Sequence, residues 1–357
     1  MLAQSTMLKY FFISVLLFSL GACKEKTEKS DTFKLNDCLP KSKTNIEDVQ
    51  LEVFFKRIDK QILQSNSLED IKAILKENPL YNQLYLERQS MPNQKGDVAE
   101  EMLLTMAKEP HLDSLMMDYE KKINIPELEK EIVKLFKNIK AFYPEFKAPV
   151  VYFSISGIGS FPLNRATDLF ISNKNEVLVI GLDWFLGTDY KYPLPETVPQ
   201  YLAKRYVAKN IPMFVAELMS GYFNVYNPND AIMLNDMLIY AKTYYFTQSV
   251  IPCLPDSSVL GYTPTQMEYI SKNKNVIWKH YLDKKLFFET ANRIKRDYVD
   301  ESPFTLPINQ ECPGGIARWT GLQILKRYAQ KKNLDLQQVM KLEKAQDILQ
   351  ESGYKGE

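Results

Sequence analysis

The chain has 357 residues, of which 45% are hydrophobic and 25% are charged, and its formal net charge is +1. These proportions are those of an ordinary globular protein that is long enough to bury a large core. A net charge so close to zero gives no electrostatic reason to expect a nucleic acid or an acidic substrate as the partner. Tyrosine (21) and phenylalanine (19) each outnumber glycine (13), which favours a helix-rich core packed with aromatic rings.

The N-terminus has the form of a bacterial lipoprotein signal. A short cationic stretch precedes the apolar residues 11–20, which are too few to span a bilayer. They end in Gly21-Ala22-Cys23, small residues before a cysteine whose thiol would be diacylated. We therefore expect residues 1–22 to be a signal peptide and Cys23 to carry the lipid anchor. A plain secretory signal with an incidental cysteine is the alternative.

Residues 23–47 are polar and mixed in charge, and we expect them to form a tether. No aspartate follows Cys23, which favours the outer membrane over the inner one. After lipidation three cysteines remain, Cys38, Cys253 and Cys312, so at least one of them stays unpaired or pairs with another chain. With two histidines in the chain and no Cys-x-x-Cys, we expect no zinc and no other cofactor.

The first part of the expected domain, residues 48–145, is mainly helical. Val49, Leu51 and Val53 alternate with polar residues and predict a short strand. The segment that begins at Phe54 is expected to turn into a helix, and Ser67 to cap the next one. The predicted helices that follow cover residues 68–77, 97–108, 111–123 and 126–142.

The second part, residues 146–357, combines a sheet with further helices. The β-rich segments 150–155, 168–172 and 176–182 predict a small, mostly antiparallel sheet of three or four strands, with a hairpin loop at 173–175. Gly157-Ile158-Gly159 is interpreted as a turn, and a nucleotide site is the alternative. The predicted helices cover residues 201–208, 211–223, 227–246, 264–274, 276–289 and 316–331, and a polar helical segment covers 331–350.

The predicted helix 211–223 contains the pentad Ala216-Glu217-Leu218-Met219-Ser220. A zinc peptidase would place His-Glu-x-x-His here, with two histidines as ligands and the glutamate as general base. This chain has the glutamate and neither histidine. A carboxylate in an apolar helix needs a partner or a raised pKa. Glu217 is therefore expected either to pair with an arginine such as Arg205 or Arg318, or to line a cleft.

The two histidines and the start of the helix 316–331 are further candidates for function. His280 is expected to be a hydrogen-bonded core histidine, with a catalytic base as the alternative, and His111 to be a surface or capping residue. Small residues at positions 317 and 321 predict that the helix 316–331 packs closely against a neighbour. Arg318 and Trp319, in its first turn, are then structural, or else contact a partner.

Several stretches, in this order, resemble the gliding-motility lipoprotein B (GldB-type) family of Bacteroidetes. They follow the signal ending at Cys23, and they are FKRIDK (55–60), FYPEF (142–146), IGLDWFLG (180–187), NDMLIYAK (235–242), GYT (261–263), GIARWTG (315–321) and SGYK (352–355). The resemblance covers nearly all of the mature chain. It implies an outer-membrane lipoprotein that is required for surface gliding and is linked to the machinery that moves and secretes adhesins.

The resemblance also implies a distant similarity to zincin-type peptidases, and hence a mainly helical α+β, zincin-like fold. The pentad falls where the zinc motif would be, with Ala216 and Ser220 in place of the ligands. We therefore expect a pseudo-peptidase rather than an enzyme, lipid-anchored in the cell envelope and acting there as a scaffold or binding component with envelope proteins as partners. A hydrolase with an atypical site around Glu217, and a periplasmic ligand-binding lipoprotein, are the alternatives.

Overall fold

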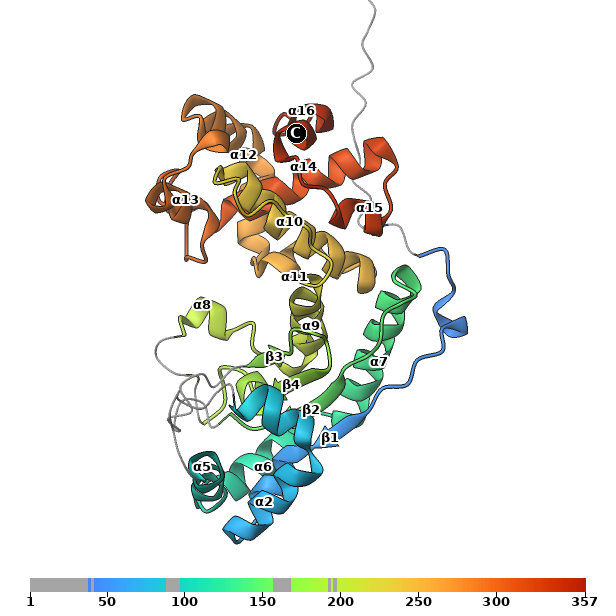
Figure 1. Ribbon diagram of the computed structural model, residues 1–357. Coiled ribbons are helices and arrows are strands. Elements are labelled where there is room, and N and C mark those ends of the chain that lie inside the picture. The colour runs from blue at the N-terminus through green and yellow to red at the C-terminus, as the bar shows by residue number, and fades with distance from the viewer. Residues whose placement is uncertain (1–37, 40–41, 88–96, 157–167, 192–193, 195–197) are drawn as a thin grey trace, which may run out of the picture. The chain divides into compact units, whose positions relative to one another are not determined.

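The computed structural model describes residues 38–39, 42–87, 97–156, 168–191, 194 and 198–357, all within a unit that extends from Leu35 to Glu357. The sheet of this part of the chain has four strands in the order β1-β2-β4-β3 (Figure 1). The strands are β1 (Phe55–Arg57), β2 (Val150–Ser154), β3 (Leu169–Ile171) and β4 (Val177–Gly181). Cys23 and Gly157-Ile158-Gly159 lie outside the described residues.

The sheet is mixed, so the prediction of a mostly antiparallel sheet was wrong. β2 runs parallel to both β1 and β4, and β3 alone pairs antiparallel, with β4. Parallel strands are covered on both faces and read as continuous apolar runs, and every residue of β4 is buried. The hairpin at 173–175, which was predicted, accounts for the one antiparallel pair.

The strand predicted at Val49–Val53 was also wrong. Strand β1 lies immediately after it, in Phe55–Arg57, where a helix was expected to begin. Val49 is buried, and Leu51 and Val53 pack half-buried against the core, so the apolar alternation there reflects burial of a segment without strand pairing. The helix that was expected through Leu63 begins at Ile58 instead.

Helices dominate the N-terminal part, as predicted. Ser67 caps α2 through a reciprocal pair of hydrogen bonds, in which Asp70 N–H donates to Ser67 Oγ (3.2 Å) and Ser67 N–H donates to Asp70 Oδ2 (2.9 Å). The helices here are α1 (Ile58–Leu63), α2 (Leu68–Glu77), α3 (Pro79–Tyr81), α5 (Val98–Ala107), α6 (Leu112–Lys122) and α7 (Ile125–Phe142), with a π-helical turn at Asn82–Leu86 and a 3₁₀ turn at Ile46–Asp48.

Helices also make up the C-terminal part. They are α8 (Gln200–Ala203), α9 (Ile211–Ser220), α10 (Met233–Val250), α11 (Asp256–Leu260), α12 (Pro264–Asp283), α13 (Asn292–Val299), α14 (Ile316–Lys332), α15 (Leu336–Met340) and α16 (Ala345–Ser352), with 3₁₀ turns at Leu182–Phe185, Ala208–Asn210 and Leu286–Phe288. Thr263 caps α12 with Gln266, as predicted. Two predicted helices at 264–274 and 276–289 are one helix, α12, followed by a turn.

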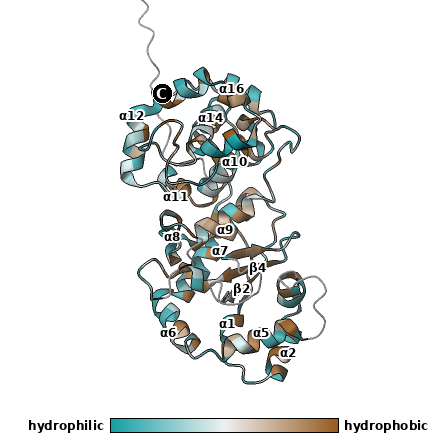
Figure 2. Ribbon diagram, turned by 90° about the vertical axis from the view of Figure 1, so that its left-hand side faces the viewer, coloured by the Kyte–Doolittle hydropathy of each residue, from teal (hydrophilic) through white to brown (hydrophobic). Residues whose placement is uncertain are grey.

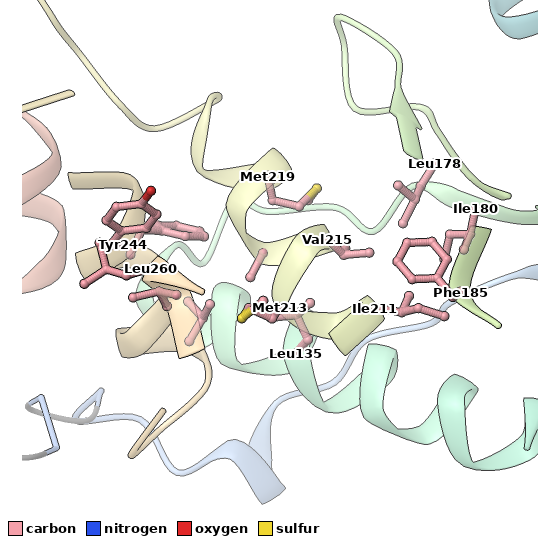
Figure 3. Packing of buried hydrophobic residues seen from close by; sticks show 14 of the residues in the cluster. Leu135, Leu178, Ile180, Phe185, Ile211, Met213, Val215, Met219, Tyr244 and Leu260 are labelled. Atoms are coloured by element: carbon pink, nitrogen blue, oxygen red, sulfur yellow. The ribbon is translucent and has the colours of Figure 1, made fainter. Parts of the chain in front are cut away.

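Helix α9 lies at the centre of the packing. It contacts α7, α10 and strand β3. Ile211 and Val215 point toward Phe185 and Ile180, on the side of the sheet, and all four are buried (Figure 3). Figure 2 shows that the strands and much of α9 are apolar, whereas α12 alternates between polar and apolar residues. Among the described residues, none of the helices combines the length and the apolar composition that crossing a bilayer requires.

Helices α10 and α14 pack closely, which confirms the prediction from the small residues of α14. Ala317 is fully buried, and a Cβ added to Gly321 would lie 2.6 Å from the backbone oxygen of Met237 in α10. Three cysteines remain after Cys23, and one of them is unpaired, as expected from their odd number. Cys38 and Cys253 form a disulfide, and Cys312 is a buried free thiol.

Candidate functional site

A cavity of about 280 Å³ lies beside α9, and we call it the Glu217 cavity. Helices α9, α10 and α14 each contribute to its wall, together with the segments around positions 202–206 and 301. Aromatic rings and four charged groups share the lining, which comprises Leu202, Arg205, Tyr206, Phe214, Glu217, Tyr240, Thr243, Tyr244, Glu301 and Arg318. Residues nearly 120 positions apart in the sequence therefore converge on one space.

Glu217 is incompletely paired in this cavity. Arg205 Nη2 lies 4.0 Å from Glu217 Oε1, which is beyond hydrogen-bond distance, and this oxygen is shielded from solvent without a hydrogen-bond partner among the described residues. Burial raises the pKa of Glu217 to about 7, against the opposing effect of the Arg205 charge. The carboxyl group is thus poised to exchange a proton near neutral pH.

Glu301 lies closer to the arginines of this cavity than Glu217 does. Arg318 Nη1 donates to Glu301 Oε1 at 2.6 Å, and Arg205 Nη1 lies 3.4 Å from the same oxygen. Arg318 is fixed further because its Nε donates to the carbonyl oxygen of Val299 (2.6 Å) and its guanidinium stacks 4.1 Å above the Tyr240 ring. The two cations are therefore drawn toward Glu301, which explains the weak pairing of Glu217.

A glycine makes room for Arg205. Gly261 has a φ of +69°, in the left-handed region that glycine favours, and a Cβ there would lie 2.7 Å from Arg205 Cδ. Arg205 also stacks on Phe214, with 5.4 Å from the guanidinium carbon to the ring centre. The missing side chain of Gly261 thus leaves space for Arg205, and the Phe214 ring packs against its guanidinium.

A second cavity of about 480 Å³ adjoins the first, and we call it the Lys209 cavity. The two cavities share Leu202, Arg205 and Glu301 in their walls. The larger one adds two exposed lysines, Lys204 and Lys209, together with the hydroxyl groups of Ser257, Ser258, Thr263 and Ser302 and the rings of Tyr201 and Tyr262. Its wall carries three cations and one carboxylate, so its charge balance is positive.

The order of motifs along this chain can now be compared with known proteins. The family model described as gliding motility protein GldB matches residues 40–356. The chain belongs to the GldB family. Neither the curated proteins nor the solved structures contain a match to it. Membership in the GldB family indicates a lipoprotein of the gliding-motility machinery, which is consistent with the cell envelope.

The residues of this GldB-family chain do not fit a zinc ion at the pentad. Ala216 is fully buried and has no donor atom, and Ser220 Oγ donates to the carbonyl oxygen of Glu217 at 2.6 Å. In the part of the chain that the structure describes, no group of three or more His, Cys, Asp or Glu side chains could hold a metal ion.

Of the other residues singled out from the sequence, His280, His111 and Trp319 do not line the Glu217 cavity. His280 Nε2 lies 2.9 Å from the hydroxyl of Tyr298, burial lowers its pKa, and it lines neither cavity. His111 is exposed at the start of α6. Trp319 is buried and lines neither cavity, whereas its neighbour Arg318 lines the Glu217 cavity.

Three charged residues of the site, Lys204, Lys209 and Glu301, were missed by sequence reasoning. The two lysines and the glutamate are separated by about ninety residues of chain, and their spacing follows no helix or strand period. Arg205, by contrast, was named as a partner for Glu217, because a buried carboxylate calls for a nearby cation. The requirement of a buried carboxylate for a nearby cation therefore predicted that Arg205 lies close to Glu217, which hydrophobic periodicity could not predict.

Proposed function

We propose that this protein is a lipid-anchored, non-catalytic component of the gliding machinery at the outer membrane, which binds an envelope protein at the cavities beside α9. In this proposal residues 1–22 are removed, Cys23 carries the lipid, residues 23–47 form a tether, and residues 48–357 form the GldB-like domain with parts 48–145 and 146–357. Family membership supports the envelope location. The lined cavities support a binding role.

The residues on either side of Glu217 support the non-catalytic role most strongly. Glu217 stands in mid-helix where a zincin would have its general base, and the positions of the two ligands hold Ala216 and Ser220. We propose that α9 is the degenerate counterpart of a zincin active-site helix. On this view the cavity persists as a binding site after loss of the ligands.

Zinc content and the variant Glu217→Gln test this proposal. We expect purified protein to contain far less than one zinc ion per chain, and Glu217→Gln to restore colony spreading to a host strain that lacks the gene. Stoichiometric zinc by elemental analysis, together with a proteolytic activity that Glu217→Gln abolishes, would overturn the proposal.

The lipid anchor has its own test. Labelled palmitate should enter the wild-type chain and the Cys312→Ala variant, because Cys312 is a buried thiol in the folded domain. Cys23→Ala should block the label and release the protein from the membrane fraction. Label that persists in Cys23→Ala would refute Cys23 as the anchor.

One observation favours a second candidate, a metal-independent hydrolase. A carboxyl group whose pKa is about 7 can act as a general acid or base at neutral pH. Such an enzyme would need a further catalytic group beside Glu217, and His280, the histidine considered for that role, lines neither cavity. Turnover of a peptide or ester substrate that is lost in Glu217→Gln would support this candidate.

A further inference from the structure

Some charged groups of the Lys209 cavity have ion-pair partners among the described residues, and others have none. Its one carboxylate, Glu301, already receives Arg318 at 2.6 Å and Arg205 at 3.4 Å. Lys204 and Lys209 are exposed, and neither forms an ion pair with a described residue. Two cations that have no ion-pair partner among the described residues and that line a cavity create a local positive potential, which attracts an anionic ligand.

The lining of the adjoining Glu217 cavity suits an aromatic group rather than an anionic one. Four aromatic rings line it, those of Tyr206, Phe214, Tyr240 and Tyr244. Glu217 also lines this cavity, and its Oε1 has no hydrogen-bond donor among the described residues. An aromatic side chain that ends in a hydroxyl group would supply both the apolar contact and the missing donor.

The two cavities are neighbours, so one extended ligand could occupy both. They share Leu202, Arg205 and Glu301, and their volumes of about 480 Å³ and 280 Å³ together exceed what a small inorganic anion would fill. A polypeptide carries both kinds of group on one chain. Carboxylates would meet Lys204 and Lys209, while a neighbouring aromatic side chain entered the Glu217 cavity.

We infer that the Lys209 and Glu217 cavities together bind an acidic polypeptide segment that inserts one aromatic side chain beside Glu217. This inference rests on the proposed binding role and names the chemistry of the partner. The ligand class follows from two lysines at one cavity and an aromatic lining with a carboxylate oxygen at the other. The two lysines and this oxygen have no hydrogen-bond partner in the part of the chain that the structure describes.

The test uses a defined probe, a fluorescein-labelled random copolymer of glutamate and tyrosine. Binding to the detergent-solubilised full chain is measured by fluorescence anisotropy. We expect this copolymer to bind at least about tenfold more tightly than a lysine–tyrosine copolymer of the same length. We also expect it to bind more tightly than polyglutamate, which has no aromatic side chain to insert.

A matched pair of double variants locates the site. Lys204→Glu with Lys209→Glu should weaken binding about tenfold, and added salt should reduce that difference. Lys134→Glu with Lys279→Glu changes the charge equally at exposed positions of α7 and α12 that line neither cavity, and should stay within about twofold of wild type. Thermal melts of both double variants check that the fold is retained.

Each contrary result has a distinct meaning. Equal or tighter binding of the lysine–tyrosine copolymer, or binding of neither probe, would overturn the acidic ligand class. An equal loss in the control pair would show general surface attraction and would also overturn the site. Polyglutamate that binds as tightly as the copolymer would overturn the aromatic insertion. None of these results bears on zinc content or colony spreading, which test the proposed function separately.

Discussion

At the scale of single residues, the protonation state of Glu217 sets the net charge of the Glu217 cavity. Arg205, Arg318 and Glu301 are the other charged groups of its lining, which also contains Tyr206, Tyr240 and Tyr244. Burial raises the pKa of Tyr206 and of Tyr244, so both tyrosines stay neutral below pH 9. Between pH 5 and pH 8, ionisation of Glu217 therefore changes the local charge by one unit.

This property predicts a pH-dependent stability for Glu217→Gln. The folded-state pKa is about 7 and the reference value is 4.5, so the unfolded chain loses its proton first as pH rises. The stability that the wild-type protein gains from protonated Glu217 is fully present below pH 4.5 and is lost as pH rises through 7. The free energy of unfolding of Glu217→Gln relative to wild type should thus increase from pH 4.5 to pH 8, by on the order of 3 kcal/mol.

Urea unfolding at pH 5 and pH 8 measures this change. Glu131, an exposed glutamate of α7, offers a matched control, and Glu131→Gln should behave like wild type at both values. A stability difference between Glu217→Gln and wild type that is the same at pH 5 and pH 8 would show that Glu217 is ionised throughout.

At the scale of elements, the pairing of α10 with α14 depends on one missing side chain. Gly321 lets the two backbones approach, because a Cβ there would meet the Met237 oxygen at 2.6 Å. Arg318 and Tyr240 project from the same two helices into the Glu217 cavity. Close packing of this pair therefore also sets the position of the site.

We expect Gly321→Ala to destabilise the protein by about 1–3 kcal/mol, even though alanine is the better helix former. The reason is that a backbone atom, unlike a flexible side chain, cannot move aside. Gly221→Ala is the comparison, since its Cβ would meet only the Leu218 oxygen, at 3.3 Å, and should cost much less. A thermal melt in which Gly321→Ala gains stability would contradict the packing described.

Elements with strong local signals were predictable from the sequence, and elements set by tertiary contacts were not. Capping pairs at Ser67 and Thr263 fixed the starts of α2 and α12. The start of α10 was placed at Asn227 but lies at Met233, whose N–H donates to the carbonyl oxygen of Glu289 (2.8 Å). Strand β1 was missed because its pairing with β2 joins residues almost a hundred positions apart, beyond the reach of periodicity.

At the scale of the whole molecule, both the site and the N-terminal attachment join distant parts of the sequence. The walls of the two cavities come from positions between 201 and 318, so family resemblance and chemical need could point to Glu217 and Arg205 but not to the cavities themselves. The disulfide links Cys38 to Cys253, a separation of 215 residues. It joins the later part of the proposed tether, at Cys38, to the turn after α10.

Removal of this disulfide should lower the free energy of unfolding by about 3–5 kcal/mol, because it closes a long loop in the unfolded chain. Cys38→Ala and Cys253→Ala should cost the same as the double variant, since each removes the same bond. Denaturant unfolding under non-reducing conditions measures the three variants. Costs that add in the double variant would contradict the pairing of these two cysteines.

Site-specific photocrosslinking in the host cell tests most directly whether a partner occupies the cavities beside α9. A benzoyl-phenylalanine replaces Lys209, which is exposed and lines the larger cavity, or Lys279, an exposed control on α12. We predict that position 209, and not 279, crosslinks to an envelope protein, at an acidic segment located by mass spectrometry. No adduct from position 209, or the same adducts from both positions, would contradict occupancy of the cavities by a partner.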